Sequence, residues 1–351
     1  MSDFAPDDPA FYLGDPHAVF GRLRREDPLP WYPGSGGAWC VLKHADVMTV
    51  SRDPQRFTST RGVQIGMNAE ARPAFVPPTI LEMDPPQHNQ HRKLVIAAFT
   101  PRAAKGQETM VRQIARECLD AIEAGGGRRS AATDAMLGEM LAYFASVLAE
   151  RRRAPKDDLV SKLAFAEIEG DQLTDPEILM FCITLLAAGN ETTRNLISGG
   201  SLLLMREPEQ KQRLLAEPAL LPNAIEEMLR WWTPVQSFIR TATRDTEMRG
   251  KQIAEGDVLL LLYASANRDE DVWGGDADRF DIGRDHAHLR HLAFGFGEHL
   301  CLGAPLARLE ARVLFEELLA RFPHFELAGE PELLHSRLMR GVERLPVRFQ
   351  R

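Results

Sequence analysis

Glycines surround one cysteine at fixed offsets, in the run Phe294-Gly295-Phe296-Gly297-Glu298-His299-Leu300-Cys301-Leu302-Gly303. Pro305 and an amphipathic stretch, Leu306 to Phe322, follow at once and predict a long helix that begins just after the cysteine. A thiolate is the form of cysteine that ligates a metal, and the start of a helix favours negative charge. The order of glycine-rich loop, cysteine and helix therefore predicts a thiolate aimed at a large flat cofactor.

The glycines of this run have separate expected roles. Gly295 and Gly303 would let the backbone approach the plane of such a cofactor, and Gly297 would take a positive φ in a tight turn. A lone cysteine is more often a small buried apolar residue. That ordinary role fits the other three cysteines of the chain, Cys40, Cys118 and Cys182. It does not explain a cysteine set inside this glycine frame.

Composition limits the class of protein. The 351 residues carry a formal net charge of -8 with a pI near 5.8, which argues against a general nucleic-acid binder. Four cysteines without a Cys-x-x-Cys pair exclude a zinc ribbon and disfavour a disulfide framework. The acidic start lacks a secretory signal, and the most apolar stretch, Met180 to Gly189, is too short to span a bilayer. We therefore expect a soluble, cytoplasmic protein without membrane contact.

Helical periodicity dominates the middle of the chain. Thr174-Asp175-Pro176-Glu177 is a capping box with proline in the first turn, and it predicts a long helix that continues to Met205. The pattern becomes strand-like between Phe238 and Tyr263, and residues 264–300 are predicted to be largely irregular. This order indicates a mainly α protein with a smaller β-rich part rather than alternating βαβ units.

The frame around Cys301 resembles the haem-binding loop of the cytochrome P450 family. The resemblance implies haem b (iron protoporphyrin IX) with Cys301 as the ligand of the iron. Four further residues of the loop would contact the cofactor: Phe294, Gly295, His299 and Gly303. Thiolate ligation pushes electron density onto iron and favours O–O cleavage, the chemistry of a monooxygenase. The resemblance also implies one catalytic domain over residues 1–351, with a cytochrome P450-like fold and a long central helix over the haem, as in soluble bacterial members.

The predicted long helix carries polar residues that helix propensity disfavours, in Ala187-Ala188-Gly189-Asn190-Glu191-Thr192-Thr193. A threonine hydroxyl can bond to a carbonyl one turn earlier and bend a helix. Taken alone, the segment indicates close packing at Gly189 with Glu191 in solvent. The resemblance implies instead the family's oxygen-activation motif, in which Glu191 is the acid that passes protons in from the surface. Thr192 is then the alcohol that delivers them where oxygen is activated.

Glu227 and Arg230 lie three residues apart, on one face of a predicted helix. On a surface such a pair contributes only ~0.2–0.5 kcal/mol. The resemblance implies a buried Glu-x-x-Arg pair that joins a later arginine, and Arg279 matches that third partner. The role of this ion network would be structural rather than catalytic, because it would hold the Cys301 loop against the core.

Cations that suit the two propionates of a haem occur at four places. His88 and Arg92 would share one face of a helix because they are four residues apart. The resemblance assigns both to the propionates, with Arg240 and His299 as further contacts. Each of these residues alone would more often be an ordinary surface cation.

The chain is shorter than most family members, and the shortage lies at one place. A predicted helix ends near Glu123, a glycine-rich run follows, and helical pattern resumes from Ala131 to Arg153. Relatives place a strand, a bundle helix and part of the lid there, so residues 124–131 mark an apparent internal deletion, whether natural, engineered or a gene-model error. A chain without these elements would expose apolar side chains of the long helix and widen the mouth of the pocket.

The function implied by the resemblance is a haem-thiolate monooxygenase that hydroxylates a lipophilic small molecule, with steroids and terpenoids as candidates. The sequence holds no flavin or iron–sulfur motif, so electrons would come from a ferredoxin or flavodoxin with its reductase. Two alternatives remain. One is a peroxide-driven peroxygenase, which would not need Glu191 and Thr192. The other is a haem-binding protein without turnover, left inactive by the deletion; a haem-free homologue conflicts with the intact Cys301 frame.

Overall fold

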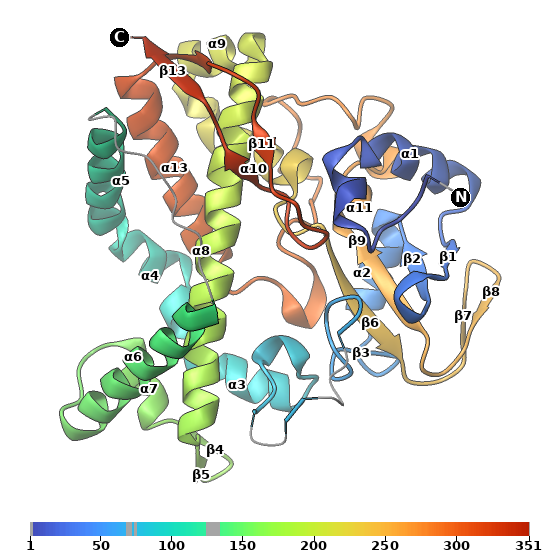
Figure 1. The fold of residues 1–351 in the computed structure, drawn as a ribbon, viewed down its shortest axis with the longest axis vertical. Helices are drawn as coiled ribbons and strands as arrows, with labels where there is room; N and C mark the ends of the chain where they lie inside the picture. Colours follow the sequence, from blue (N-terminus) through green and yellow to red (C-terminus); the bar gives the residue numbers. More distant parts are fainter. Residues whose placement is uncertain (1–2, 68–71, 74–75, 124–133, 351) are drawn as a thin grey trace.

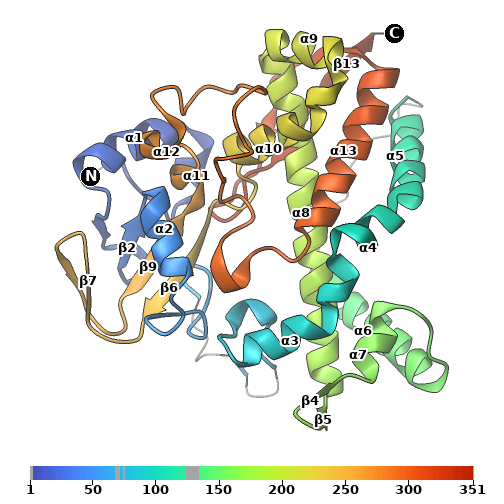
Figure 2. The same cartoon turned by 180° about the vertical axis from the view of Figure 1, so that it is seen from behind.

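The computed structural model describes residues 3–67, 72–73, 76–123 and 134–350. A long helix, α8 (Asp175–Arg206), runs through the middle, with most other helices on one side and the main sheet on the other (Figures 1 and 2). The backbone N–H of Thr174 donates to the Glu177 carboxylate (2.8 Å), and the N–H of Glu177 donates to the Thr174 hydroxyl (3.5 Å). The capping box predicted for this helix is therefore confirmed.

Most of the longer helices pack around α8, some of them on the side of the sheet (Figures 1 and 2). They are α3 (Gln87–Val95), α4 (Pro101–Gly106), α5 (Glu108–Glu123), α6 (Asp134–Arg153), α7 (Leu159–Ala164), α9 (Pro208–Ala216), α10 (Leu221–Trp232) and α13 (Ala304–Arg321). The largest apolar core joins the second half of α8 to α10 and α13, through Leu202, Met228 and Phe315. A Cβ at Gly199 of α8 would overlap the ring of Trp232, so glycine permits the close crossing of α8 and α10.

The β-rich part is a five-stranded sheet beside the N-terminal helices. Its order is β1 (Trp31–Tyr32), β2 (Ala38–Val41), β9 (Val258–Leu262), β6 (Ser237–Ala242) and β3 (Phe57–Thr58). Only β2 and β9 pair in parallel, and Cys40 lies opposite Leu260. Helices α1 (Pro16–Glu26) and α2 (His44–Ser51) cover the sheet, and apolar side chains of β9 contribute to the core on both faces.

Four two-stranded ribbons and several short helices complete the part of the chain that the structure describes. The ribbons pair β4 (Glu167–Ile168) with β5 (Asp171–Gln172), β7 (Thr246–Met248) with β8 (Lys251–Ile253), β10 (His324–Leu327) with β13 (Val347–Gln350), and β11 (Glu332–Leu333) with β12 (Val342–Arg344). The short helices are α11 (Tyr263–Ala266), α12 (Glu270–Trp273) and the 3₁₀ turns Pro9–Leu13, Gly34–Gly36, Ile80–Glu82, Ile96–Phe99, Pro218–Leu220 and Gly297–His299. The mainly α architecture with a smaller β part, and the largely irregular segment 264–300, agree with the predictions.

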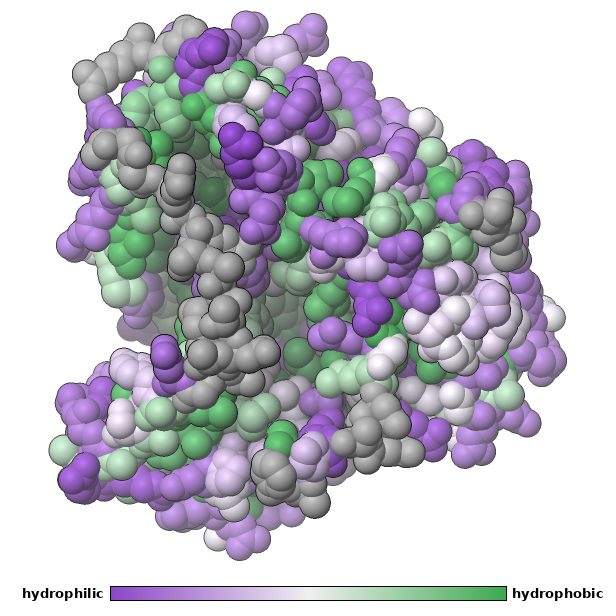
Figure 3. All heavy atoms as spheres, in the orientation of Figure 1, coloured by the Kyte–Doolittle hydropathy of each residue, from purple (hydrophilic) through white to green (hydrophobic). Residues whose placement is uncertain are grey.

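Apolar side chains are exposed on the helical side, where Figure 3 shows a hollow in the surface. Met110 and Ile114 of α5 are 53% and 50% exposed, and Leu186 of α8 is 44% exposed. Exposure of an apolar side chain on the long helix is what the apparent deletion predicts. The deletion itself was assigned to residues 124–131, which lie outside the described residues. No helix in the described ranges is long and apolar enough to cross a membrane.

Candidate active site

Backbone hydrogen bonds hold the loop that carries Cys301. The N–H of Cys301 donates to the carbonyl of Phe294 (2.8 Å), and the N–H of Leu300 donates to the carbonyl of Gly297 (3.1 Å). Gly297 has a φ of 71°, and a Cβ at this position would overlap the carbonyl oxygen of Ser51. The predicted positive φ is therefore confirmed, and the close approach of α2 makes glycine necessary there.

Two further glycines lie on either side of Cys301. Gly295 has a φ of 69°, so its conformation, in addition to its small size, favours glycine. The nearest atom to a Cβ at Gly303 would be the sulfur of Cys301, at 4.0 Å. Gly303 therefore lies directly beside the thiol, as a residue that contacts the cofactor should.

The Cys301 side chain is accessible to solvent although protein surrounds it on most sides. Burial raises the pKa of its thiol, against the hydrogen bonds that the N–H groups of Gly303 and Ala304 donate to the sulfur and the positive charges of Arg92 and Arg308. Helix α13 begins at Ala304, so the sulfur lies at a helix N-terminus as predicted. These two hydrogen bonds and two positive charges all favour the thiolate over the thiol. A metal ion bound to the sulfur would favour the thiolate further.

The structure brings together the two histidines and two arginines that the sequence analysis assigned to the propionates. The ring centroids of His88, from α3, and His299, from the Cys301 loop, are 4.4 Å apart. Arg92 lies one turn after His88 and donates from Nη2 to the carbonyl of Leu300 (2.8 Å). Arg240 comes from β6 and is only 5% exposed. Elements far apart in the sequence thus place these side chains in one region.

Burial and the neighbouring arginines disfavour the protonated form of both histidines. Burial, followed by the charges of Arg240, His88 and Arg92, lowers the pKa of His299 to about 2. Burial is also the main cause that lowers the pKa values of the other three. Within the described ranges, neither Arg92 nor Arg240 forms an ion pair with a carboxylate. Two propionates would supply the missing negative charge, so the residues present fit haem, with Cys301 at the iron.

The sequence analysis missed one contact of this region. The hydroxyl of Ser59 lies 3.1 Å from Nε2 of His299 and orients the ring. Ser59 is fully buried and its backbone N–H donates to Asp84 (3.0 Å), just before α3. No sequence signal marks Ser59, because its partner lies on a distant loop.

Thr192 lies on helix α8, about two turns after Leu185. The Thr192 hydroxyl donates to the carbonyl of Ala188 (2.6 Å), the bond one turn back that the sequence indicated, and α8 continues through the segment. Leu185 of the same helix and Leu302, next to Cys301, pack in one apolar cluster. This stretch of α8 is therefore adjacent to the loop.

Glu191 lies on a more open face of α8. Its side chain is 40% exposed and forms an ion pair with Nη2 of Arg194 at 2.5 Å. A carboxylate that reaches solvent and stands next to Thr192 in the sequence suits the predicted proton donor. Its catalytic role and that of Thr192 stay predictions.

The Glu227–Arg230 pair is fully buried. Nε and Nη2 of Arg230 donate to the two carboxylate oxygens of Glu227 at 2.7 and 2.8 Å. The remaining donors of Arg230 bind three backbone carbonyls, those of Asn267, Ala277 and Arg279. Burial would raise the pKa of Glu227, but the hydrogen bonds from Arg230 and His286 lower it to about 2. The pair is ionised and ties α10 to the irregular segment before Cys301.

The third arginine of this network is Arg284, so the assignment of Arg279 is corrected. Arg279 is exposed and offers only its carbonyl oxygen, to Arg230 (3.0 Å) and Arg284 (3.1 Å). The side chain of Arg284 is 7% exposed, and its Nε lies 3.3 Å from Glu227. Both arginines belong to the irregular segment, where no periodicity tells which side chain turns inward.

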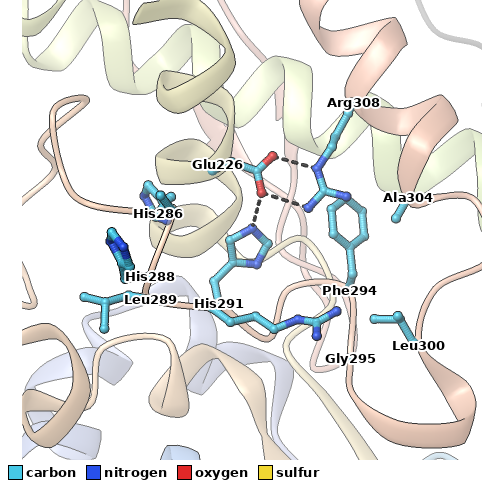
Figure 4. Close-up of a pocket in the computed structure, with 12 residues that line it drawn as sticks. Glu226, His286, His288, Leu289, His291, Phe294, Gly295, Leu300, Ala304 and Arg308 are labelled. Atoms are coloured by element: carbon cyan, nitrogen blue, oxygen red, sulfur yellow. Dashed lines mark hydrogen bonds and ion pairs between the residues drawn. The ribbon is translucent and has the colours of Figure 1, made fainter. Parts of the chain in front are cut away.

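A cavity of about 290 Å³ lies beside Phe294 and Gly295 (Figure 4). Glu226 of α10 lines it and accepts hydrogen bonds from Nε and Nη2 of Arg308 at 2.7 and 2.8 Å, and from Nε2 of His291 at 3.1 Å. The sequence analysis did not single out these three residues. Their one signal is the doubled acid Glu226-Glu227 in the middle of α10, because adjacent positions on a helix face different sides and need different partners.

Comparison with known proteins agrees with the geometry. The family profile described as Cytochrome P450 matches residues 128–349. Cytochrome P450 109 of Bacillus spizizenii is 36% identical, with 95% of this chain and 92% of the relative covered, and linalool 8-monooxygenase of Pseudomonas putida is 33% identical, with 95% of each covered. The crystal structure of CYP109E1 from Bacillus megaterium with testosterone has a TM-score of 0.83 at 31% identity, covering 95% of this chain and 97% of that one.

The alignments also bear on the length of the chain. Both sequence matches extend over 389 positions, more than the 351 residues of this chain. The relatives therefore contain residues that this chain lacks, as the apparent internal deletion requires.

Proposed function

Because the chain belongs to the cytochrome P450 family, whose members are monooxygenases that bind haem b, we propose that it hydroxylates a lipophilic small molecule with O₂ and two electrons from separate proteins. The observation that carries this proposal is the accessible thiol of Cys301 at a helix N-terminus, next to two neutral histidines and two arginines that form no ion pair with a described carboxylate. A thiolate ligand and two propionate sites are what such a reaction needs from the protein.

Each site residue has a defined task in this proposal. Haem, when bound, supplies the oxygen chemistry that protein side chains lack. His88, Arg92, Arg240 and His299 would hold its propionates, and Cys301 its iron. The fixed loop hydrogen bonds orient the cysteine before the cofactor binds.

Thr192 and Glu191 would supply protons to the site of oxygen activation. The Thr192 hydroxyl donates its hydrogen to the carbonyl of Ala188, so its oxygen is left to accept a hydrogen bond from a water. That water would be held where a proton is needed. Glu191, partly exposed and paired with Arg194, would exchange protons with solvent and replenish the site.

The substrate would lie against three segments that backbone hydrogen bonds join. The N–H of Ile239 in β6 donates to the carbonyl of Val63 (2.9 Å), and the N–H of Gln236 donates to the carbonyl of Leu338 (2.8 Å). Phe238, between them in β6, packs edge-on against the ring of Tyr263. Apolar side chains prevail here and on Leu185–Ala188 of α8, which favours a lipophilic substrate.

Two relatives support the substrate class. One is named for linalool, a terpenoid, and another was crystallised with testosterone, a steroid. We propose a terpenoid or steroid as the first class to test. The electron donor would be a ferredoxin or flavodoxin that docks beside the Cys301 loop, where the exposed side chain of Arg290 provides positive charge.

The test is turnover by the haem-loaded protein with a ferredoxin, a flavin reductase and NADPH, using linalool and testosterone as substrates. We expect substrate-dependent consumption of NADPH with formation of a hydroxylated product. Product formed with hydrogen peroxide alone would favour the peroxygenase. A protein that holds haem but forms no product by either route would be the inactive haem binder.

A further inference from the structure

Asn267 lies where the end of α10 meets the segment that leads to Cys301. The residue follows the short helix α11 and is fully buried. Its backbone N–H donates to the carbonyl of Tyr263 (2.9 Å), and its carbonyl accepts Nη1 of Arg230, from α10, at 2.9 Å. The backbone of Asn267 is therefore held on both sides, which leaves the side-chain amide to join separate segments.

The oxygen of this amide binds the segment before the cysteine loop. Oδ1 of Asn267 accepts the backbone N–H of Leu292 at 2.6 Å, and Leu292 is fully buried in an apolar core. The carbonyl of Leu292 in turn accepts the N–H of Gly295 (2.9 Å). The carbonyl of Phe294 accepts the N–H of Cys301 itself (2.8 Å). The amide is thus linked to the cysteine through two further hydrogen bonds of the main chain.

The nitrogen of the amide binds the residue that ends α10. Nδ2 donates to the hydroxyl of Thr233 (2.9 Å), and this hydroxyl donates to the carbonyl of Arg230 (2.7 Å). A hydroxyl has one hydrogen, so the oxygen of Thr233 is the acceptor in its bond with Asn267. Thr233 has a φ of 51°, and this left-handed turn brings its hydroxyl back to the last turn of α10.

The two partners allow the amide only one orientation. The N–H of Leu292 requires the amide oxygen. The hydroxyl oxygen of Thr233, whose hydrogen is already donated, requires the amide nitrogen. A flip of the Asn267 amide would lose both hydrogen bonds where water does not reach, because all three residues are buried. The orientation of the side chain is therefore fixed.

Other contacts also reach this stretch of the chain, but they hold it differently. Nε2 of His291 donates to Glu226 of α10 at 3.1 Å, which fixes a side chain and leaves the backbone free to shift. The carbonyl of Arg290 is held by Nε2 of His44 (2.8 Å), which belongs to α2. Asn267 differs from both because it connects the backbone of this stretch to α10.

We propose that Asn267 is a positioning residue for Cys301: its amide sets the distance between the end of α10 and the loop that carries the cysteine. This inference rests on the proposed role of Cys301 as the ligand of the haem iron. If the amide is removed, the buried N–H of Leu292 loses its acceptor, and the chain before the loop shifts until this N–H finds another one. The displaced loop then leaves part of the bound haem without its sulfur ligand.

The absorption spectrum of the haem-loaded protein, reduced and exposed to carbon monoxide, tests the proposal. The measured quantity is the ratio of the short-wavelength band, from haem without a thiolate ligand, to the red-shifted band. Asn267→Ala should raise this ratio about tenfold, the factor that corresponds to one lost buried hydrogen bond. Thr233→Val removes the acceptor of Nδ2 and should also raise the ratio, whereas Thr233→Ser keeps the hydroxyl and should retain the parent ratio.

The matched control is Asn223→Ala. Nδ2 of Asn223 in α10 donates to the carbonyls of Ile282 and Arg284 (2.7 and 2.9 Å), earlier in the same irregular segment. Denaturant titration should show a loss of stability in both Asn223→Ala and Asn267→Ala, but only the second should change the ratio of the bands. Should Asn267→Ala fail to fold, the ratio in Thr233→Val decides.

Three results would overturn the proposal. One is a parent ratio in both Asn267→Ala and Thr233→Val. Another is an equal rise in Asn223→Ala, because any loss of stability would then displace the loop. The third is a parent protein that holds haem but lacks the red-shifted band, which would refute the proposed role of Cys301 and with it the role of Asn267.

Discussion

The imidazole rings of His88 and His299 lie 4.4 Å apart at an angle of 53°, one from α3 and one from the loop before Cys301. Burial and the charge of Arg92 lower the pKa values of both rings, and Arg240 acts in addition on His299. The contact therefore joins α3 to the cysteine loop while both rings stay neutral. Protonation of either ring at low pH should weaken this contact between α3 and the cysteine loop.

We expect the free energy of unfolding of the haem-free protein to fall as the pH is lowered below 6.5. In the fold the pKa of His299 is lowered to about 2, whereas an unfolded histidine titrates near 6.5. Between these values the unfolded chain binds a proton that the folded chain does not, so acid favours unfolding. At pH 5 this one residue accounts for about 2 kcal/mol. Urea denaturation at pH 7 and pH 5 measures the effect.

The variant His299→Asn isolates the contribution of His299 to the pH dependence of the free energy of unfolding. It should make the loss of stability between pH 7 and pH 5 smaller, whereas His288→Asn, at an 84% exposed side chain, should not change it. Equal pH dependence in His299→Asn and the parent protein would contradict the assignment.

Cys301→Ala should abolish the red-shifted absorption band that a thiolate-ligated haem shows when it is reduced and exposed to carbon monoxide, because the iron loses its sulfur ligand. The matched control is Cys118→Ala, at an exposed cysteine of α5, which should keep the band. A thiolate-type spectrum in Cys301→Ala would refute the assignment of the ligand.

Glu227→Gln should destabilise the protein by about 3–5 kcal/mol, because Arg230 would stay buried without its counter-charge. Denaturant titration measures this loss. Arg284→Gln should also lower stability, since its side chain is buried against Glu227. Arg279→Gln is the control and should change stability by less than about 0.5 kcal/mol. A larger loss in Arg279→Gln than in Arg284→Gln would reverse the correction made above.

Thr192→Ala should keep the haem but divert electrons to peroxide, because the water that supplies protons would lose its acceptor. The ratio of product to NADPH consumed measures this coupling. Thr184→Ala removes an equivalent hydroxyl on the same helix, bonded to the carbonyl of Met180 (2.7 Å), and should leave the ratio unchanged. Full coupling in Thr192→Ala would count against the relay.

Local signals predicted the elements that carry the site. The capping box at Thr174 begins α8, Pro305 lies in the first turn of α13, and the glycine frame fixes the turn at Gly297. In each case neighbouring residues alone determine the backbone conformation. The same holds for Glu227 and Arg230, because one helical turn brings them together.

Contacts between distant segments escaped prediction. The parallel pairing of β2 with β9 depends on strands more than two hundred residues apart, and neither strand carries a signal for the other. The choice between Arg279 and Arg284 depends on the course of an irregular segment.

Arg230 binds the segment before Cys301 through main-chain oxygens, those of residues 267, 277 and 279. Every amino acid carries such an oxygen, so these hydrogen bonds of Arg230 do not depend on which side chains occupy the three positions. Asn267 aside, this part of the molecule can thus accept many substitutions over evolutionary time while the distance between helix and cysteine loop stays constant. The surface beside the loop can therefore vary without displacing Cys301 behind it.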